Sequence, residues 1–253
     1  MYNTYRNIPA GVLYDLFHQQ PSTPTTNNNQ YIPSSIWPLT LHFTGFPSTI
    51  LTAYHGDPSL QSSLINSLKE ASFIACGTAK PVMDIIPQAR DDLWRSIVDA
   101  DHAQYRMIMD SLPLRNSDIK SAVPVRVLCV LQSGRGGYVS SYESIAQTSR
   151  PVHLKTSTAS RITLREAIEP IVEKWVSVTS TLHQHHDNDN DGGNMDKISS
   201  IGGTHVWNTL IRAVSVGGIM PPGDALLIDL HRDLHDPDFF LYIVVHLNTS
   251  LSL

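Results

Sequence analysis

The sequence has 253 residues but only two cysteines, Cys76 and Cys129, and it contains no basic run and no long apolar run. Both cysteines stand among apolar neighbours, which favours buried thiols in a reducing compartment over a disulfide framework. A net charge of −5, without a stretch rich in lysine and arginine, argues against a nucleic-acid partner. No segment approaches the roughly 18 apolar residues that a membrane-spanning helix needs. The hydrophobic fraction of 41% nevertheless supports a folded core of one large or two small domains.

The motifs typical of enzymes are incomplete in this chain. His231–Leu234 copies the start of the kinase catalytic loop, but Asp238 stands where that motif requires asparagine. About fifteen residues follow, too few for the segments that such an enzyme needs, so we interpret this run as a helix end before the last strand. Gly134–Gly137 is not followed by a helix start, which favours a hairpin turn over a phosphate-binding loop.

A polar insertion rich in histidine and aspartate covers about 181–203. Within it, Asp187–Gly192 copies the first half of a calcium-binding loop, yet Ile198 occupies the position that requires a bidentate glutamate. Histidines at positions 183, 185 and 186 stand close by. A disordered insertion is the favoured interpretation, because the segment is too polar to bury a core. An unrelated enzyme that binds metal through this insertion stays open as an alternative.

The first half of the chain is predicted to be mainly helical. Residues 8–17 show apolar residues at helical spacing, whereas 37–46 alternates apolar and polar residues as a half-buried strand does. A longer helix is predicted to begin at Asp57, whose side chain would cap free N–H groups, and to end at Gly77. Its expected buried stripe consists of Leu60, Leu64, Leu68, Ala71 and Ala75. A further helix is predicted from about Asp91 to Leu112.

The second half of the chain changes to strand patterns at Val123. Thr163 and Glu166 form a capping box at a helix start, and Pro170 is expected to kink or end that helix. The predicted order is a strand at 123–131, a turn at 134–137, a strand at 138–154, a helix from Thr163, a strand at 205–216, a short helix at 224–234 and a strand at 239–247. This order is that of the ubiquitin-like β-grasp, in which one long helix packs across a mixed sheet.

Several stretches, weak singly but specific in their order and spacing, together resemble the autophagy protein 5 family over almost the whole chain. They are Pro9–Leu16, Leu39–Pro47, Leu68-Lys69-Glu70-Ala71 with Gly77-Thr78-Ala79-Lys80, Asp91-Asp92-Leu93-Trp94, Pro124–Val127 and Pro237–Ile243.

This resemblance implies an α+β fold in which two ubiquitin-like β-grasp domains, the first incomplete, flank a helix-rich domain. We expect the partial first domain at 1–52, the helix-rich domain at 53–120 and the second ubiquitin-like domain at 121–253. The initial strands of the family's first domain have no counterpart here, so we expect a member truncated at its N-terminus. Without those partner strands, the apolar faces of 8–17 and 37–46 are expected to lie partly in water.

The resemblance also implies a function without catalysis. In that family, the lysine at the Lys69 position receives the C-terminus of the ubiquitin-like autophagy protein 12 from a ubiquitin-conjugating-type enzyme. Lys80 lies just past the same helix and is the second candidate acceptor. On the residues alone, Lys69 is interpreted as a solvated lysine that covers the edge of an apolar stripe. No cofactor, metal ion or catalytic residue is expected.

The implied partners are autophagy protein 12, joined covalently, and the coiled-coil autophagy protein 16. Their assembly promotes lipidation of autophagy protein 8 during autophagosome formation, so the protein is expected in the cytoplasm and peripherally on the phagophore assembly site membrane. A ubiquitin-like interaction module that has lost conjugation is a further alternative.

Overall fold

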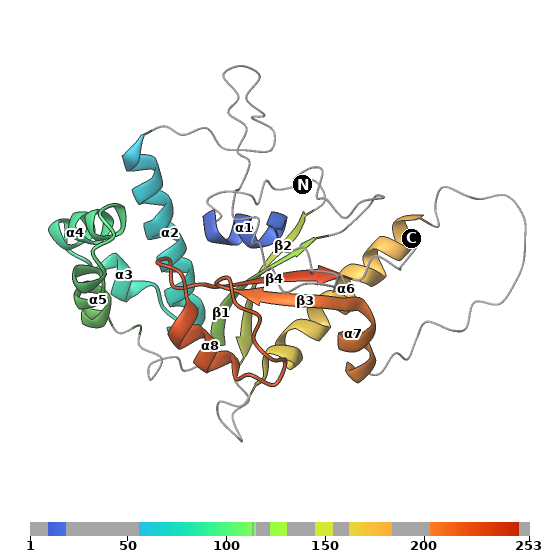
Figure 1. Cartoon of the computed structure of the whole chain (residues 1–253). Coiled ribbons are helices and arrows are strands. Elements are labelled where there is room, and N and C mark those ends of the chain that lie inside the picture. Colours follow the sequence, from blue (N-terminus) through green and yellow to red (C-terminus); the bar gives the residue numbers. More distant parts are fainter. Residues whose placement is uncertain are drawn as a thin grey trace, which may run out of the picture.

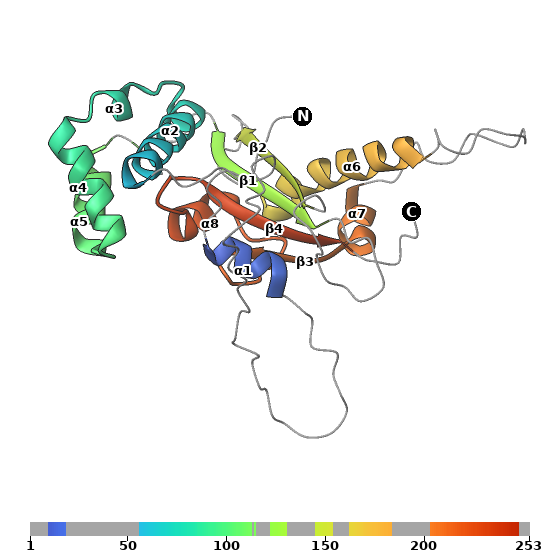
Figure 2. The same ribbon diagram turned by 90° about the horizontal axis from the view of Figure 1, so that it is seen from above.

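The computed structural model describes residues 10–18, 56–112, 114, 122–130, 145–153, 162–183 and 203–247. A group of helices lies beside a four-stranded sheet that carries helices of its own (Figures 1 and 2). The expected strand at 37–46, the turn at 134–137 and most of the insertion at 181–203 lie outside the described residues. Within the described residues, no helix is long and apolar enough to cross a membrane.

Four helices form the helical group, and the first is the longest. They are α2 (Asp57–Cys76), α3 (Lys80–Met83), α4 (Pro87–Val98) and α5 (His102–Ser111). Helix α2 ends as predicted at Gly77, whose φ of 77° is left-handed and whose N–H bonds Phe73 O at 2.9 Å. Its start differs from the prediction, because Gly56 is the capping residue and Asp57 already belongs to the first turn. Leu60 is 37% exposed, so the buried stripe begins one turn later than predicted.

The single helix predicted from Asp91 to Leu112 is wrong, because the chain breaks between α4 and α5. Ala100 adopts a positive φ of 54°, which ends α4, and Asp101 starts α5. The Asp101 carboxylate accepts hydrogen bonds from the N–H groups of Ala103 and Gln104, which satisfies free donors of the new helix. Apolar spacing continued across the break and hid it, whereas the aspartate was the signal of a new start.

The sheet has the strand order β2-β1-β4-β3. Its strands are β1 (Ala122–Val130), β2 (Ile145–His153), β3 (Ile211–Val216) and β4 (Leu241–Leu247). Strand β1 pairs with β2 antiparallel and with β4 parallel, and β3 pairs with β4 antiparallel. The predicted mixed sheet and ubiquitin-like order of elements are therefore confirmed.

Helix α6 (Leu164–His183) is the long helix of this ubiquitin-like unit. The capping box is confirmed, since Thr163 N donates to Glu166 Oε2 at 2.9 Å and Glu166 N donates to Thr163 Oγ1 at 3.3 Å. The expected end at Pro170 is wrong, because the helix continues to His183. Ile168 and Val172 are fully buried on either side of the proline, and this burial offsets the lost backbone hydrogen bond.

The strand predicted at 205–216 is too long. Helix α7 (Gly203–Leu210) occupies its first half, and β3 begins at Ile211. Trp207 of α7 stacks with the Arg165 guanidinium of α6, 5.2 Å from the ring centroid, so tertiary contact holds this turn in helical form. The short helix α8 (Leu227–Leu234) and strand β4 each begin slightly later than predicted.

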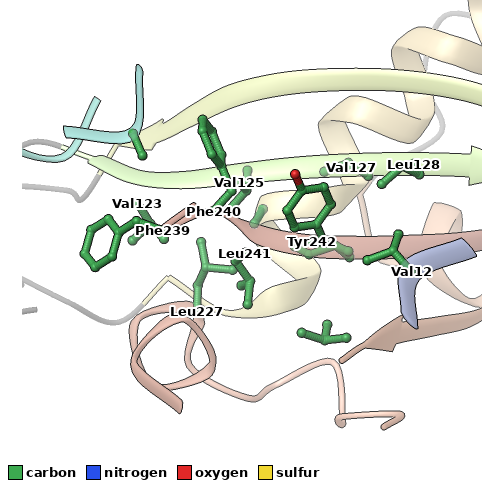
Figure 3. Close-up of a cluster of buried hydrophobic side chains, with 14 of the residues drawn as sticks. Val12, Val123, Val125, Val127, Leu128, Leu227, Phe239, Phe240, Leu241 and Tyr242 are labelled. Carbon is green, nitrogen blue, oxygen red and sulfur yellow. The ribbon is translucent and has the colours of Figure 1, made fainter. Parts of the chain in front are cut away.

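Helices cover the sheet on both sides (Figures 1 and 2). Helix α6 lies on one side, whereas α1 (Ala10–His18) and α2 lie against β4 and β1 on the other. Val12 and Leu16 of α1 are only 5% and 2% exposed, and Figure 3 shows Val12 beside the apolar side chains of β1 and β4. The expectation that the apolar face of 8–17 lies partly in water is therefore wrong for these two residues. The sheet itself covers them.

Candidate functional site

Lys69 lies in the second half of α2, on the side of the helix that faces α4. Its side chain is partly buried and lines a groove of about 290 Å³ between these two helices. The groove is lined by Gln61, Ser62, Ile65, Asn66 and Lys69 of α2 and by Pro87, Arg90 and Asp91 of α4.

The sequence of α2 explains this orientation. Leu68 and Ala71 are fully buried, and successive residues of a helix are rotated by about 100°, so Lys69 is turned away from the core while staying beside it. Within the described residues, the Lys69 side chain makes no hydrogen bond or ion pair. Its amine is therefore available in the groove.

One hydrogen bond spans the groove. Gln61 Nε2 of α2 donates to Asp91 Oδ1 of α4 at 2.9 Å. The neighbouring Asp92 instead accepts from Gln88 of its own helix, also at 2.9 Å, and does not line the groove. The structure thus brings Asp91, but not Asp92, into the same groove as Lys69.

Lys80 has a different setting. It is the first residue of α3, its side chain is exposed, and it does not line the groove. The connector that precedes it is fixed by Ser72 Oγ, which donates to Thr78 O at 2.8 Å, and by Lys80 N, which donates to Thr78 Oγ1 at 3.2 Å.

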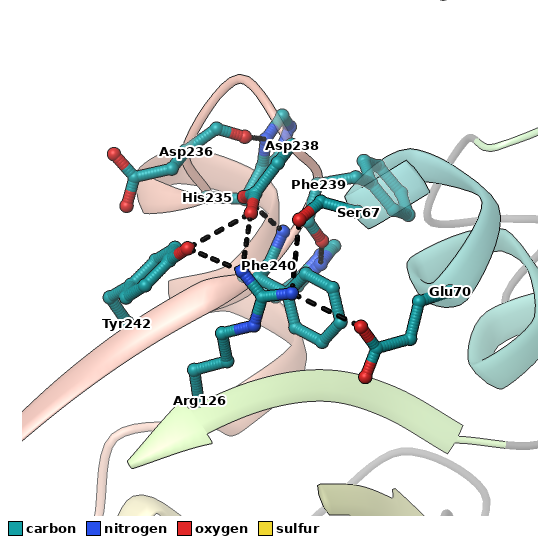
Figure 4. A network of polar contacts seen from close by, with 10 residues as sticks. Ser67, Glu70, Arg126, His235, Asp236, Asp238, Phe239, Phe240 and Tyr242 are labelled. Atoms are coloured by element: carbon teal, nitrogen blue, oxygen red, sulfur yellow. Dashed lines mark hydrogen bonds and ion pairs between the residues drawn. The ribbon is translucent and has the colours of Figure 1, made fainter. Parts of the chain in front are cut away.

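A buried polar cluster joins α2 to the sheet, and sequence reasoning missed it. Arg126 of β1 lies at its centre, and we call the group the Arg126 cluster (Figure 4). Its other members are Ser67 and Glu70 of α2, Asp238 of the turn before β4, and Tyr242 of β4.

The sheet side of the Arg126 cluster has the shorter contacts. Arg126 Nη1 lies 2.8 Å from Asp238 Oδ2 and 2.6 Å from the Tyr242 hydroxyl, and that hydroxyl donates to Asp238 Oδ2 at 2.9 Å. The guanidinium also stacks on Phe240, 3.8 Å from the ring centroid. On the helix side, Nη2 reaches Ser67 Oγ at 3.1 Å and Glu70 Oε2 at 3.2 Å.

Burial makes this cluster electrostatically strong. The side chains of Arg126 and Asp238 are 9% and 11% exposed. Burial alone would lower the pKa of Arg126, but Tyr242, Asp238 and Glu70 outweigh it and raise that pKa, so the guanidinium stays charged. One signal in the sequence could have revealed the cluster. Arg126 is a charged residue inside a buried strand, and a buried charge requires a partner.

The other sequence motifs have structural roles within the described residues. His231–Leu234 forms the last turn of α8, which confirms the interpretation as a helix end. Those residues contain no group of three or more potential metal ligands, and positions 184–202 of the histidine- and aspartate-rich insertion lie outside them. Cys129 is buried and Cys76 half-buried, and neither is joined in a disulfide.

Two family models match this chain. The model described as "Autophagy protein ATG5, alpha-helical bundle region" matches residues 58–114, and "Autophagy protein ATG5, UblB domain" matches residues 122–245. The chain belongs to the autophagy protein 5 family. Its role therefore lies in autophagy.

Relatives in this family come from plants and fungi. The chain is 28% identical to autophagy protein 5 of Oryza sativa subsp. indica over 296 residues, which cover 96% of the chain and 74% of the relative. It is 24% identical to that of Arabidopsis thaliana, over 94% and 75% of the two chains. The crystal structure of Kluyveromyces marxianus Atg5 has a TM-score of 0.58 at 20% identity, covering 94% of this chain and 67% of that one. That likeness shows the fold, which agrees with the predicted α+β class.

Proposed function

We propose that this protein is the acceptor for covalent conjugation of the ubiquitin-like autophagy protein 12, and that Lys69 is the acceptor residue. The conjugate binds the coiled-coil autophagy protein 16 and promotes lipidation of autophagy protein 8 during autophagosome formation. The protein acts in the cytoplasm and peripherally on the phagophore assembly site membrane. It supplies position and surface, and the conjugating enzyme supplies the chemistry.

The observation that supports Lys69 is its free amine in the groove. The side chain has no partner among the described residues, and it is held by a long helix within the region that the family's helical-bundle model matches. Lys80 has an exposed amine but no groove. A protein partner can therefore recognise the surroundings of Lys69 more specifically, because groove walls restrict the approach of its thioester.

The reaction needs no group from this chain except the amine. The neutral Lys69 Nζ attacks the thioester carbonyl carbon of the charged conjugating enzyme, a C–N bond forms, and the C–S bond breaks to release the enzyme's thiolate. The proton lost by the amine passes to that thiolate or to solvent. Burial raises the pKa of Cys129 to about 12, so this thiol is poorly suited to carry a thioester of its own.

The proposed domain organisation follows the sequence boundaries given above. A partial ubiquitin-like domain occupies 1–52, the helix-rich domain with Lys69 occupies 53–120, and the second ubiquitin-like domain occupies 121–253. The family matches at 58–114 and 122–245 lie within the last two of these ranges, which supports the proposed division.

Reconstitution with autophagy protein 12 and its conjugating enzymes tests the proposal. The intact chain should form an adduct, Lys69→Arg should abolish it, and Lys80→Arg should leave it unchanged, because arginine is no amine nucleophile at neutral pH. Mass spectrometry of the digested adduct should show a branched peptide at Lys69. A branch at Lys80 with Lys69 unmodified would overturn the assignment. Absence of an adduct with retained binding of autophagy protein 16 would favour an interaction module without conjugation.

A further inference from the structure

We propose that Arg126 is a positioning residue for Lys69: through Ser67 and Glu70 it fixes the rotation of α2, so that the acceptor amine opens into the groove. This inference rests on the proposed function of Lys69. Arg126 makes no contact with Lys69 and takes no part in bond making.

The spacing on α2 carries the first step. Ser67 and Glu70 are three residues apart, so they share one face of the helix, and both contact the same Arg126 nitrogen. Lys69 lies between them in sequence and on a different face. Because a rotation of α2 by one residue position is about 100°, holding Ser67 and Glu70 also determines where Lys69 points.

Apolar packing determines which face of α2 is buried. That face includes the fully buried Leu68, Ala71, Ser72 and Ala75, and the last three have small side chains. The hydrogen bond between Gln61 and Asp91 is exposed to solvent. The contacts of Ser67 and Glu70 to Arg126 are directional, so they define the orientation of α2 more narrowly than packing of small side chains does.

Arg126 is suited to this task because the sheet holds it rigidly. Asp238 and Tyr242 bind one terminal nitrogen, and Phe240 stacks under the plane of the guanidinium. Asp238 is itself fixed, since its Oδ1 accepts the N–H of Phe240 at 3.2 Å. The second terminal nitrogen is thereby presented to α2 from a fixed point on β1.

The test removes the contacts on the helix side and leaves the sheet side intact. In the double variant Ser67→Ala/Glu70→Ala, Arg126 keeps Asp238 and Tyr242, so no buried charge loses its partner on the sheet. The matched control is Gln88→Ala/Asp92→Ala, which removes one hydrogen bond and one carboxylate from α4 outside the groove. Arg126→Lys, which keeps the charge but loses the planar fork, is a second variant.

Four readouts separate positioning from general destabilisation. The adduct rate at saturating charged enzyme should fall about tenfold in Ser67→Ala/Glu70→Ala, since small misplacements of a nucleophile are costly. The enzyme concentration at half-saturation should not change. The share of branched peptide at Lys69 should fall in favour of other lysines, and backbone amides of α2 should exchange hydrogen faster. The control should match the intact chain in all four, and Arg126→Lys should be intermediate.

The proposal is overturned if Ser67→Ala/Glu70→Ala keeps the rate within twofold and all branching at Lys69. It is also overturned if the rate falls equally in the control. If the intact chain forms no adduct, the proposed function fails separately. Hydrogen exchange of the α2 amides is then the test of whether the Arg126 cluster fixes this helix. An exchange rate in Ser67→Ala/Glu70→Ala equal to that of the intact chain refutes the positioning role.

Discussion

The Asp15 carboxylate of α1 accepts a hydrogen bond of 2.7 Å from the Ser215 hydroxyl of β3, 200 positions later in the chain. The same oxygen accepts the Gly218 N–H at 2.9 Å. Both Asp15 and Ser215 are buried, so this contact fastens α1 onto the sheet and keeps Val12 and Leu16 out of water.

Replacing Asp15 should therefore destabilise the protein. Asp15→Ala leaves a buried hydroxyl and a backbone N–H without a partner, at a cost of about 1–3 kcal/mol in the free energy of unfolding. Denaturant unfolding of Asp15→Ala, Ser215→Ala and the double variant forms a cycle that isolates the shared contact. We expect the double variant to lose less than the sum of the single losses. Strict additivity would show that the two side chains are energetically independent.

Stability should depend on pH through Asp236, which lies in the turn between α8 and β4. Burial, reinforced by the charge of Asp238, raises the pKa of Asp236 to about 7. Because this pKa is higher in the folded than in the unfolded state, the contribution is fully present below about pH 4 and declines as pH rises to 7. Asp236→Asn should remove this decline and raise stability at pH 8 by roughly 2–3 kcal/mol.

His231 should make stability depend on pH in the opposite direction and over a different pH range. Burial lowers its pKa to about 4, so the folded state binds its proton less readily than the unfolded state does. Stability is then lost as pH falls from about 6.5 towards 4. Thermal unfolding of Asp236→Asn and the intact chain between pH 4 and pH 8 separates the two groups. If the difference in melting temperature between the variant and the intact chain is the same at every pH, Asp236 does not titrate as described.

The groove beside Lys69 should distinguish two adjacent aspartates. Asp91→Ala removes the hydrogen bond to Gln61 that joins the groove walls, so the adduct rate should fall by about threefold to tenfold, the equivalent of one hydrogen bond. Asp92→Ala removes the same charge outside the groove and should stay within about twofold. Single-turnover conjugation assays on both variants provide the measurement. Equal losses would indicate that net charge, and not the groove, governs the rate.

Helix α6 should gain stability when its internal proline is removed. Pro170 is exposed and has no N–H, so Pro170→Ala supplies the backbone donor that the helix lacks at this position. Removing proline also raises the conformational entropy of the unfolded chain, which offsets part of this effect. We therefore expect the free energy of unfolding to increase by roughly 1–2 kcal/mol. The midpoint of urea unfolding measures it, with Glu173→Ala as a control that is exposed on the same helix. An unchanged midpoint would mean that the backbone already compensates for the proline.

Local signals predicted the elements whose boundaries depend on a few neighbouring residues. The end of α2 follows from Gly77, and the start of α6 follows from the capping box of Thr163 and Glu166. The succession of strands along the chain also followed from alternation and apolar runs. In contrast, α7 was misread because its apolar residues fit both a short helix and a strand, and Trp207 decides between them through a contact with another helix.

The candidate site likewise contains features that local sequence predicts and features that depend on tertiary packing. Lys69 could be named from its resemblance and its place on a helix, but the groove depends on how α4 packs against α2. The Arg126 cluster could not be assembled from the sequence, because its members come from three distant segments and the periodicity within each segment does not show which residues meet between them. Asp15 was likewise unremarkable in sequence, and its burial arises only from the docking of α1.

The parallel pairing of β1 with β4 sets an order of events during synthesis. Val125 pairs with Leu241, and Arg126 with Tyr242, so the centre of the sheet stays open until the ribosome has produced both strands. The helices α2 to α5 have local contacts and can form long before that point. A nascent chain therefore carries Lys69 on a formed helix while Arg126 still lacks Asp238 and Tyr242. On the proposed roles of Lys69 and Arg126, conjugation should therefore follow release of the finished chain, and a chain stalled before β4 should be a poor substrate.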